Sequence, residues 1–203
     1  MEMWNKTRNV TRIIACGVFK PVLEYIELER RYPNLYLTYL PSRLHLRPQE
    51  LEKHLLQEVN KAKRRSERII CLYGECFPDI DDFCQQHGII KVPGFYCYEM
   101  LLGGERFKQL IEEIAGTYFL EEDLIINFVE YCMRPLELQD QEMRKLCFEN
   151  YTRLLYVRQP SDPNLVPKAG ELAKFLGLDL EIHDADYSYL EKQLTELIEQ
   201  RLP

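Results

Sequence analysis

Three cysteines of this chain stand at the ends of short apolar runs, where they could share one site. Cys16 and Cys76 each close such a run, and Cys97 follows the next one along the chain. Apolar runs of this length are typical of buried strands, and the carboxyl ends of parallel strands meet at one edge of a sheet, where α/β proteins bind ligands. Three thiolates can hold a four-iron cluster with one iron open to substrate, or a zinc ion completed by a fourth ligand. The positions therefore predict a three-cysteine metal site, although the chain has no CxxC pair.

His45 and Arg47 lie in a predicted loop that follows a strand in the same part of the chain as Cys16. His45 is a candidate for the fourth metal ligand or for a proton donor, and Arg47 is a candidate anion-binding residue. A different chemistry would make Cys76 a thiolate nucleophile with His45 as its base, which requires the two side chains within hydrogen-bonding distance. A solvated loop histidine and an arginine that stabilises the turn are the ordinary alternatives.

The other four cysteines are predicted to pack in the core as small apolar residues. Cys71 alternates with apolar residues inside a strand, and the remaining three fall in helical patterns: Cys84, Cys132 and Cys147. The acidic pairs Asp81-Asp82 and Glu121-Glu122 stand at predicted helix starts, where carboxylates complement the helix dipole. These residues are therefore given structural roles.

Composition excludes several classes of function. The 203 residues carry a net charge of −7, which argues against a nucleic-acid surface, and the basic cluster Lys61–Arg65 is expected to be a solvated helix end.

Neither a phosphate-binding glycine loop nor a Gly-x-Ser-x-Gly motif is present. No run reaches the roughly 18 to 20 apolar residues of a membrane span. Met1–Arg8 lacks a secretory apolar run, and seven cysteines suit a reducing compartment, so we expect a cytoplasmic protein.

Hydrophobic periodicity predicts an α/β fold of three βαβα Rossmann-like units over residues 10–66, 67–115 and 150–203, with a helical insertion at 116–151. Strands that alternate with helices imply parallel pairing and right-handed crossovers. We expect a single α/β domain over residues 1–203. Its strands either extend one doubly wound, mostly parallel sheet or form small lobes around a central cleft.

Two helical segments contain residues that predict interruptions. Gly103-Gly104 falls inside the helix predicted from Tyr98 to Ile114 and is expected to mark a kink or a break. Pro135 is expected to break the helical region that begins at Glu121. Gly116–Leu120, just before that region, is predicted to be extended.

Several short motifs resemble the family called domain of unknown function 1638. They occur in the expected order: Ile14–Gly17, Tyr39–Pro41 with Leu44–Pro48, Tyr73–Cys76, Cys97 followed by Leu101–Gly103 and Glu105–Phe107, and Gly116–Leu120. The resemblance picks out the same three cysteines and the same histidine. Two positions depart from the family pattern: Phe77-Pro78 replaces a glycine after Cys76, and Phe95-Tyr96 replaces a His-Asp pair before Cys97. Any role of that missing histidine cannot be carried over.

The resemblance implies an association with anaerobic one-carbon and corrinoid methyltransfer metabolism. On this basis we expect an iron–sulfur cluster or zinc as cofactor, and corrinoid or methyltransferase proteins as partners. The alternative is a metal-free accessory protein that binds a methyltransferase, suggested by the acidic charge and the thirteen tyrosines. The substrate and the reaction do not follow from these residues.

Overall fold

The structure, a computed structural model, describes residues 10–200 and divides the chain into two compact units. The first unit comprises residues 1–93 and 193–203, and the second comprises residues 94–192. The prediction that Met1–Arg8 lacks a secretory apolar run concerns residues outside those that the structure describes. Within those residues no helix is long and apolar enough to cross a membrane.

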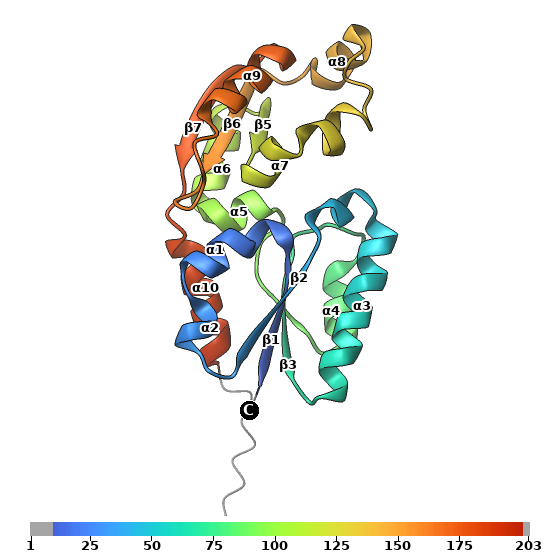
Figure 1. Ribbon diagram of the computed structural model, residues 1–203, viewed down its shortest axis with the longest axis vertical. Helices are drawn as coiled ribbons and strands as arrows, with labels where there is room; N and C mark the ends of the chain where they lie inside the picture. The colour runs from blue at the N-terminus through green and yellow to red at the C-terminus, as the bar shows by residue number, and fades with distance from the viewer. Residues whose placement is uncertain (1–9, 201–203) are drawn as a thin grey trace, which may run out of the picture. The chain divides into compact units, whose positions relative to one another are not determined.

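The first unit is built on a four-stranded parallel sheet. Its elements are β1 (Thr11–Cys16), α1 (Lys20–Tyr25), α2 (Leu28–Arg31), β2 (Leu35–Leu40), α3 (Pro48–Arg64), β3 (Arg68–Leu72), α4 (Ile80–Gln86) and β4 (Ile90–Lys91), with short 3-10 helices at Gly17–Phe19 and Ser42–Leu46. The strand order is β2-β1-β3-β4, and every neighbouring pair is parallel. Figure 1 shows α3 and α4 on one face of this sheet and α1 and α2 on the other.

The second unit is built on a separate three-stranded parallel sheet of order β5-β6-β7. Its elements are α5 (Cys97–Leu102), α6 (Gly104–Glu113), β5 (Thr117–Leu120), α7 (Glu122–Ile126), a π-helix at Val129–Met133, α8 (Gln141–Phe148), β6 (Arg153–Arg158), α9 (Val166–Leu176), β7 (Asp179–Asp184) and α10 (Ser188–Glu199). The last residues of α10, from Gln193 on, belong to the first unit.

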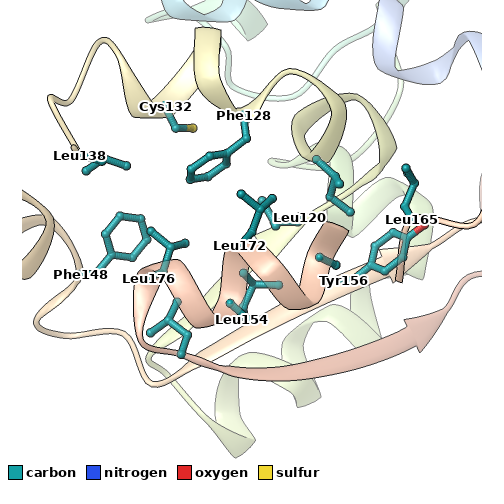
Figure 2. Close-up of a cluster of buried hydrophobic side chains, with 14 residues drawn as sticks. Leu120, Phe128, Cys132, Leu138, Phe148, Leu154, Tyr156, Leu165, Leu172 and Leu176 are labelled. Atoms are coloured by element: carbon teal, nitrogen blue, oxygen red, sulfur yellow. The ribbon is translucent and has the colours of Figure 1, made fainter. Parts of the chain in front are cut away.

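One face of the second sheet carries the core that Figure 2 shows. Alternate residues of a strand point to opposite faces, so Leu154 and Tyr156 of β6 face this core while Arg153 faces away from it. Side chains from the helical segments that follow β5 and β6 complete the cluster: Phe128, Cys132, Leu138, Phe148, Leu172 and Leu176. Cys132 is therefore a core residue, as its position predicts, and Cys147 packs partly buried against the same cluster.

The predicted α/β class with parallel strands is confirmed, and the strands form two separate sheets. The first two predicted βαβα units together build the four-stranded sheet, because β3 pairs directly with β1. The third unit gains a strand from the segment expected to be extended, since Thr117–Leu120 pairs with β6. The helix break is also confirmed: α5 ends at Leu102, and Gly103 has a φ of +84°, which favours glycine.

Candidate functional site

The carboxyl edge of the first sheet holds two of the predicted cysteines. Cys16 is the last residue of β1, and Cys76 follows the end of β3 by four residues. The chain moves from β1 to β2 on one side and from β3 to β4 on the other, so the gap between β1 and β3 is a topological switch point. Open α/β sheets bind ligands at such points. Gly17 makes the turn after β1 possible, since a Cβ there would lie 3.2 Å from the Leu40 carbonyl oxygen.

Tyr73 lies between the ends of β1 and β3 and is 1% exposed. Its hydroxyl donates to the Ala15 carbonyl oxygen at 3.3 Å. Burial raises the pKa of Tyr73, and the neighbouring thiol groups of Cys16, Cys71 and Cys76 raise it further. Cys16 and Cys76 therefore both lie in the electrostatic neighbourhood of one buried phenol.

The Cys76 thiol is not activated as a nucleophile. Burial is the largest influence on its pKa and raises it, although the Lys91 ammonium and a hydrogen bond with the Gly74 backbone lower it. Lys91 is itself engaged by two carboxylates, with Glu75 at 2.8 Å and Asp81 at 3.1 Å. At neutral pH the Cys76 side chain is consequently a thiol and not a thiolate.

Cys71 and Cys84 form a pair that the sequence does not reveal. Both are buried, as predicted for core residues, at 0% and 3% exposure. A hydrogen bond joins the two side chains, raising the pKa of Cys71 and lowering that of Cys84. Lys91 lowers the pKa of both thiols, so β3, α4 and β4 contribute one residue each to a buried cluster with a single cation.

The other predicted site residues of the first unit lie on its surface. His45 is exposed in the 3-10 helix Ser42–Leu46 that follows β2. Arg47 is exposed at the start of α3 and pairs with Glu50 at 3.2 Å, which is the turn-stabilising role.

Cys97, the third predicted ligand, is the first residue of α5 and belongs to the second unit. It is partly buried. The two residues before it are exposed aromatics, Phe95 at 63% and Tyr96 at 57%. Within residues 10–200, neither unit by itself contains three or more His, Cys, Asp or Glu side chains arranged to hold a metal ion.

The carboxyl edge of the second sheet holds an acidic cluster that sequence reasoning missed. Glu121 follows β5 directly and caps α7, its two carboxylate oxygens accepting from the N–H groups of Asp123 and Leu124 at 2.8 Å each. The helix-start role predicted from its position is therefore present. Glu121 is nevertheless 4% exposed, and burial raises its pKa to about 8. Nothing in the local sequence signals that burial.

Asp162, in the loop after β6, completes this acidic cluster. Its Oδ2 accepts from the Tyr156 hydroxyl at 2.6 Å and from the Gln159 N–H at 2.9 Å, while its Oδ1 is buried without a hydrogen-bond donor. Burial raises the pKa of both Asp162 and Glu122, and a hydrogen bond joins their carboxyl groups. The Gln159 side-chain amide, also buried, has no partner in the described part of the chain.

A family model described as a protein of unknown function (DUF1638) matches residues 39–194. The match confirms the resemblance carried by the short motifs and covers more than half of the chain. Cys76, Cys97 and His45 fall within the matched residues, whereas Cys16 precedes them. No curated protein and no solved structure matches the chain.

Proposed function

The chain belongs to the DUF1638 family of proteins of unknown function, and from that premise we propose a metal-binding role for its strand-end cysteines. In this proposal Cys16, Cys76 and Cys97 hold an iron–sulfur cluster or a zinc ion, with His45 as a further candidate ligand. The observation that supports it is the position of Cys16 and Cys76 at the switch point of the first sheet, both beside Tyr73.

The first unit alone does not supply a complete donor set. Cys16 and Cys76 are two thiols, and structural or catalytic zinc takes three or four protein ligands. The proposal therefore includes Cys97 as its third thiol. Bound metal supplies the positive charge that deprotonates a coordinating thiol, so the raised pKa of Cys76 is compatible with a ligand role and unfavourable for a metal-free nucleophile. For this reason the Cys76–His45 enzyme is the weaker candidate.

The cellular setting is part of the proposal. The seven cysteines suit a reducing compartment, and this supports the proposal of a cytoplasmic protein. The link to anaerobic one-carbon and corrinoid methyltransfer metabolism rests on the family resemblance alone.

Anaerobic purification followed by iron, zinc and acid-labile sulfide analysis tests the metal site. We expect stoichiometric metal in the natural chain and its loss in Cys16→Ala, Cys76→Ala and Cys97→Ala. Cys147→Ala is the matched control, because this thiol packs against the core of the second unit and is outside the proposed donor set. Substoichiometric metal that none of the three substitutions changes would remove the proposal.

A metal-free accessory protein that binds a methyltransferase is the second candidate. The exposed side chains of Phe95 and Tyr96 favour it, because adjacent exposed aromatics are common in protein interfaces. A pull-down from an anaerobic host should then recover a corrinoid or methyltransferase protein with the natural chain and lose it with Phe95→Ala/Tyr96→Ala. Recovery of no methyltransfer component by the natural chain counts against this candidate.

A further inference from the structure

A cavity of about 730 Å³ opens at the amino edge of the first sheet, opposite the edge that carries Cys16 and Cys76. The first residues of β1, β3 and β4 line it, and Ile198 of α10 closes one side. Ligand-binding clefts of proteins typically measure roughly 300–1,000 Å³. The cavity is therefore large enough for a small organic molecule.

The apolar wall of the cavity comes from Ile90 and Ile198. Two cations, Lys63 and Arg68, stand beside this wall. Lys63 belongs to the basic cluster at the end of α3, and it differs from its neighbour Lys61, which pairs with Glu58 at 2.6 Å outside the cavity. An apolar wall next to positive charge is the surface that an amphipathic anion recognises.

Neither cavity cation has a carboxylate partner among the described residues. Arg68 donates to the backbone carbonyl oxygens of Leu197 at 2.6 Å and Ile198 at 3.2 Å. Lys63 Nζ lies 3.5 Å from His87 Nδ1. Neither contact is with a carboxylate.

The carboxylates that line the cavity are already engaged. Glu67 is held by Arg12, with Nη2 to Oε1 at 3.0 Å, and its side chain is 6% exposed. Glu199, at the end of α10, accepts from the Tyr32 hydroxyl at 2.8 Å. The carboxylates of the cavity therefore already have hydrogen-bond donors, whereas Lys63 and Arg68 supply positive charge to an incoming anion.

Arg68 is partly buried, and removing its charge from water is unfavourable. Burial lowers its pKa. Its Nε atom is buried and has no hydrogen-bond partner among residues 10–200. Partly buried charge without an opposite charge is unfavourable, and an anion in the cavity would relieve it.

We propose that this cavity binds a small amphipathic carboxylate, whose head lies toward Lys63 and Arg68 and whose hydrocarbon chain packs on Ile90 and Ile198. A bare inorganic anion would leave the isoleucine wall in water. A neutral apolar molecule would leave both cations uncompensated. This site is independent of the strand-end cysteines and of the metal proposed for them.

Isothermal titration of the full chain with octanoate, octan-1-ol and acetate tests the proposal. Octanoate combines both features, octan-1-ol lacks the charge, and acetate lacks the chain. We expect octanoate to bind at one site, and acetate and octan-1-ol to bind at least about tenfold more weakly. Binding of octan-1-ol as tight as that of octanoate, or no binding of octanoate, would overturn the proposal.

Two variants place the octanoate in this cavity. Lys63→Gln should weaken octanoate binding by about threefold to fivefold, the effect of a partly exposed ion pair, without changing octan-1-ol binding. Ile90→Trp should block both ligands by filling the apolar wall. Lys61→Gln, which removes a nearby charge outside the cavity, should leave octanoate binding unchanged. Equal affinity in Lys63→Gln and the natural chain contradicts the assignment, even if Ile90→Trp fails to fold.

Discussion

Arg153 shows how one buried cation can be satisfied within a small parallel sheet. It is 4% exposed at the start of β6, and its guanidinium donates to Thr117 Oγ1 at 2.9 Å, Glu181 Oε2 at 2.8 Å and the Leu110 carbonyl oxygen at 2.6 Å. We expect Arg153→Met to lower the free energy of unfolding by about 2–4 kcal/mol, because buried acceptors lose their donor. Urea unfolding followed by circular dichroism measures the loss.

Arg158 on the same strand is the matched control. It pairs with Asp184, but both side chains are well exposed, at 43% and 68%. Arg158→Met should therefore change the free energy of unfolding by less than about 1 kcal/mol. Equal losses in the two variants would mean that the buried network contributes no more than a surface ion pair.

Glu121 makes the stability of the second unit dependent on pH. Burial raises its pKa from the usual 4.5 to about 8. Between these values the unfolded chain has released the proton and the folded chain retains it. Stability should therefore fall as pH rises from 4.5 to 8, by at most about 1.4 kcal/mol per pH unit from this group.

Melting temperatures across this pH range isolate the contribution of Glu121. Glu121→Gln removes the titrating group, so its melting temperature should fall less steeply with rising pH than that of the natural chain. Glu149→Gln, which changes an exposed carboxyl group at the end of α8, should keep the natural slope. An unchanged slope in Glu121→Gln would show that Glu121 ionises at its ordinary pKa in the folded protein.

Residue type and position predicted part of the candidate sites and missed the rest for a physical reason. Residue patterns correctly indicated that Cys71 and Cys84 are buried, that Cys16 ends a strand and that Cys76 follows one. The hydrogen bond between Cys71 and Cys84 depends on how α4 packs on β3, which no local pattern encodes. The same holds for the interaction between Glu122 and Asp162, because these residues meet only when β5 pairs with β6.

At the scale of elements, two glycines of the second unit should respond oppositely to the same substitution. A Cβ at Gly116, before β5, would lie 2.5 Å from the Asn150 carbonyl oxygen, whereas one at Gly170 in α9 would meet only a Leu180 methyl carbon at 4.0 Å. Gly116→Ala should destabilise by about 1–3 kcal/mol through this backbone clash. Gly170→Ala should stabilise by about 0.5–1 kcal/mol through helix propensity.

Thermal unfolding of the two alanine variants measures the predicted loss of stability in Gly116→Ala and the predicted gain in Gly170→Ala. A stable Gly116→Ala protein would show that the loop before β6 can move away from β5 at little cost. A destabilised Gly170→Ala protein would show that α9 has no room beside β7.

Element boundaries followed closely from the sequence, whereas the division into sheets did not. Glycine and proline mark the breaks because their backbone restrictions are local: Gly103 separates α5 from α6, and the region around Pro135 separates the π-helix from α8. The helical region predicted from Glu121 contains three short pieces instead of one long helix. Which strands pair is decided by side chains distant in sequence, so one sheet and two sheets were equally compatible with the pattern.

At the scale of the whole molecule, α10 is divided between the two units: it begins in the second unit and ends in the first. Its end therefore contributes to the stability of the first unit. Residues from Gln193 on are grouped with the first unit, where Arg68 donates to Leu197 and Ile198, and Tyr32 donates to Glu199. In a chain truncated after Lys192, the backbone amides of β1 and β3 should therefore lose more protection from hydrogen exchange than those of β5 and β6. Hydrogen exchange measured by mass spectrometry resolves the two sheets, and equal loss in both would contradict this division.

The return of α10 to the first unit also fixes an order of events during synthesis. A ribosome makes β1, β2, β3 and β4 first, yet Arg68 cannot meet its carbonyl acceptors until the entire second unit has been translated. A nascent chain that carries the first sheet alone exposes the amino edge where the 730 Å³ cavity will form. Early domains usually fold while later ones are still being made. Here the amino edge of the earlier sheet is completed only after the later sheet has been made.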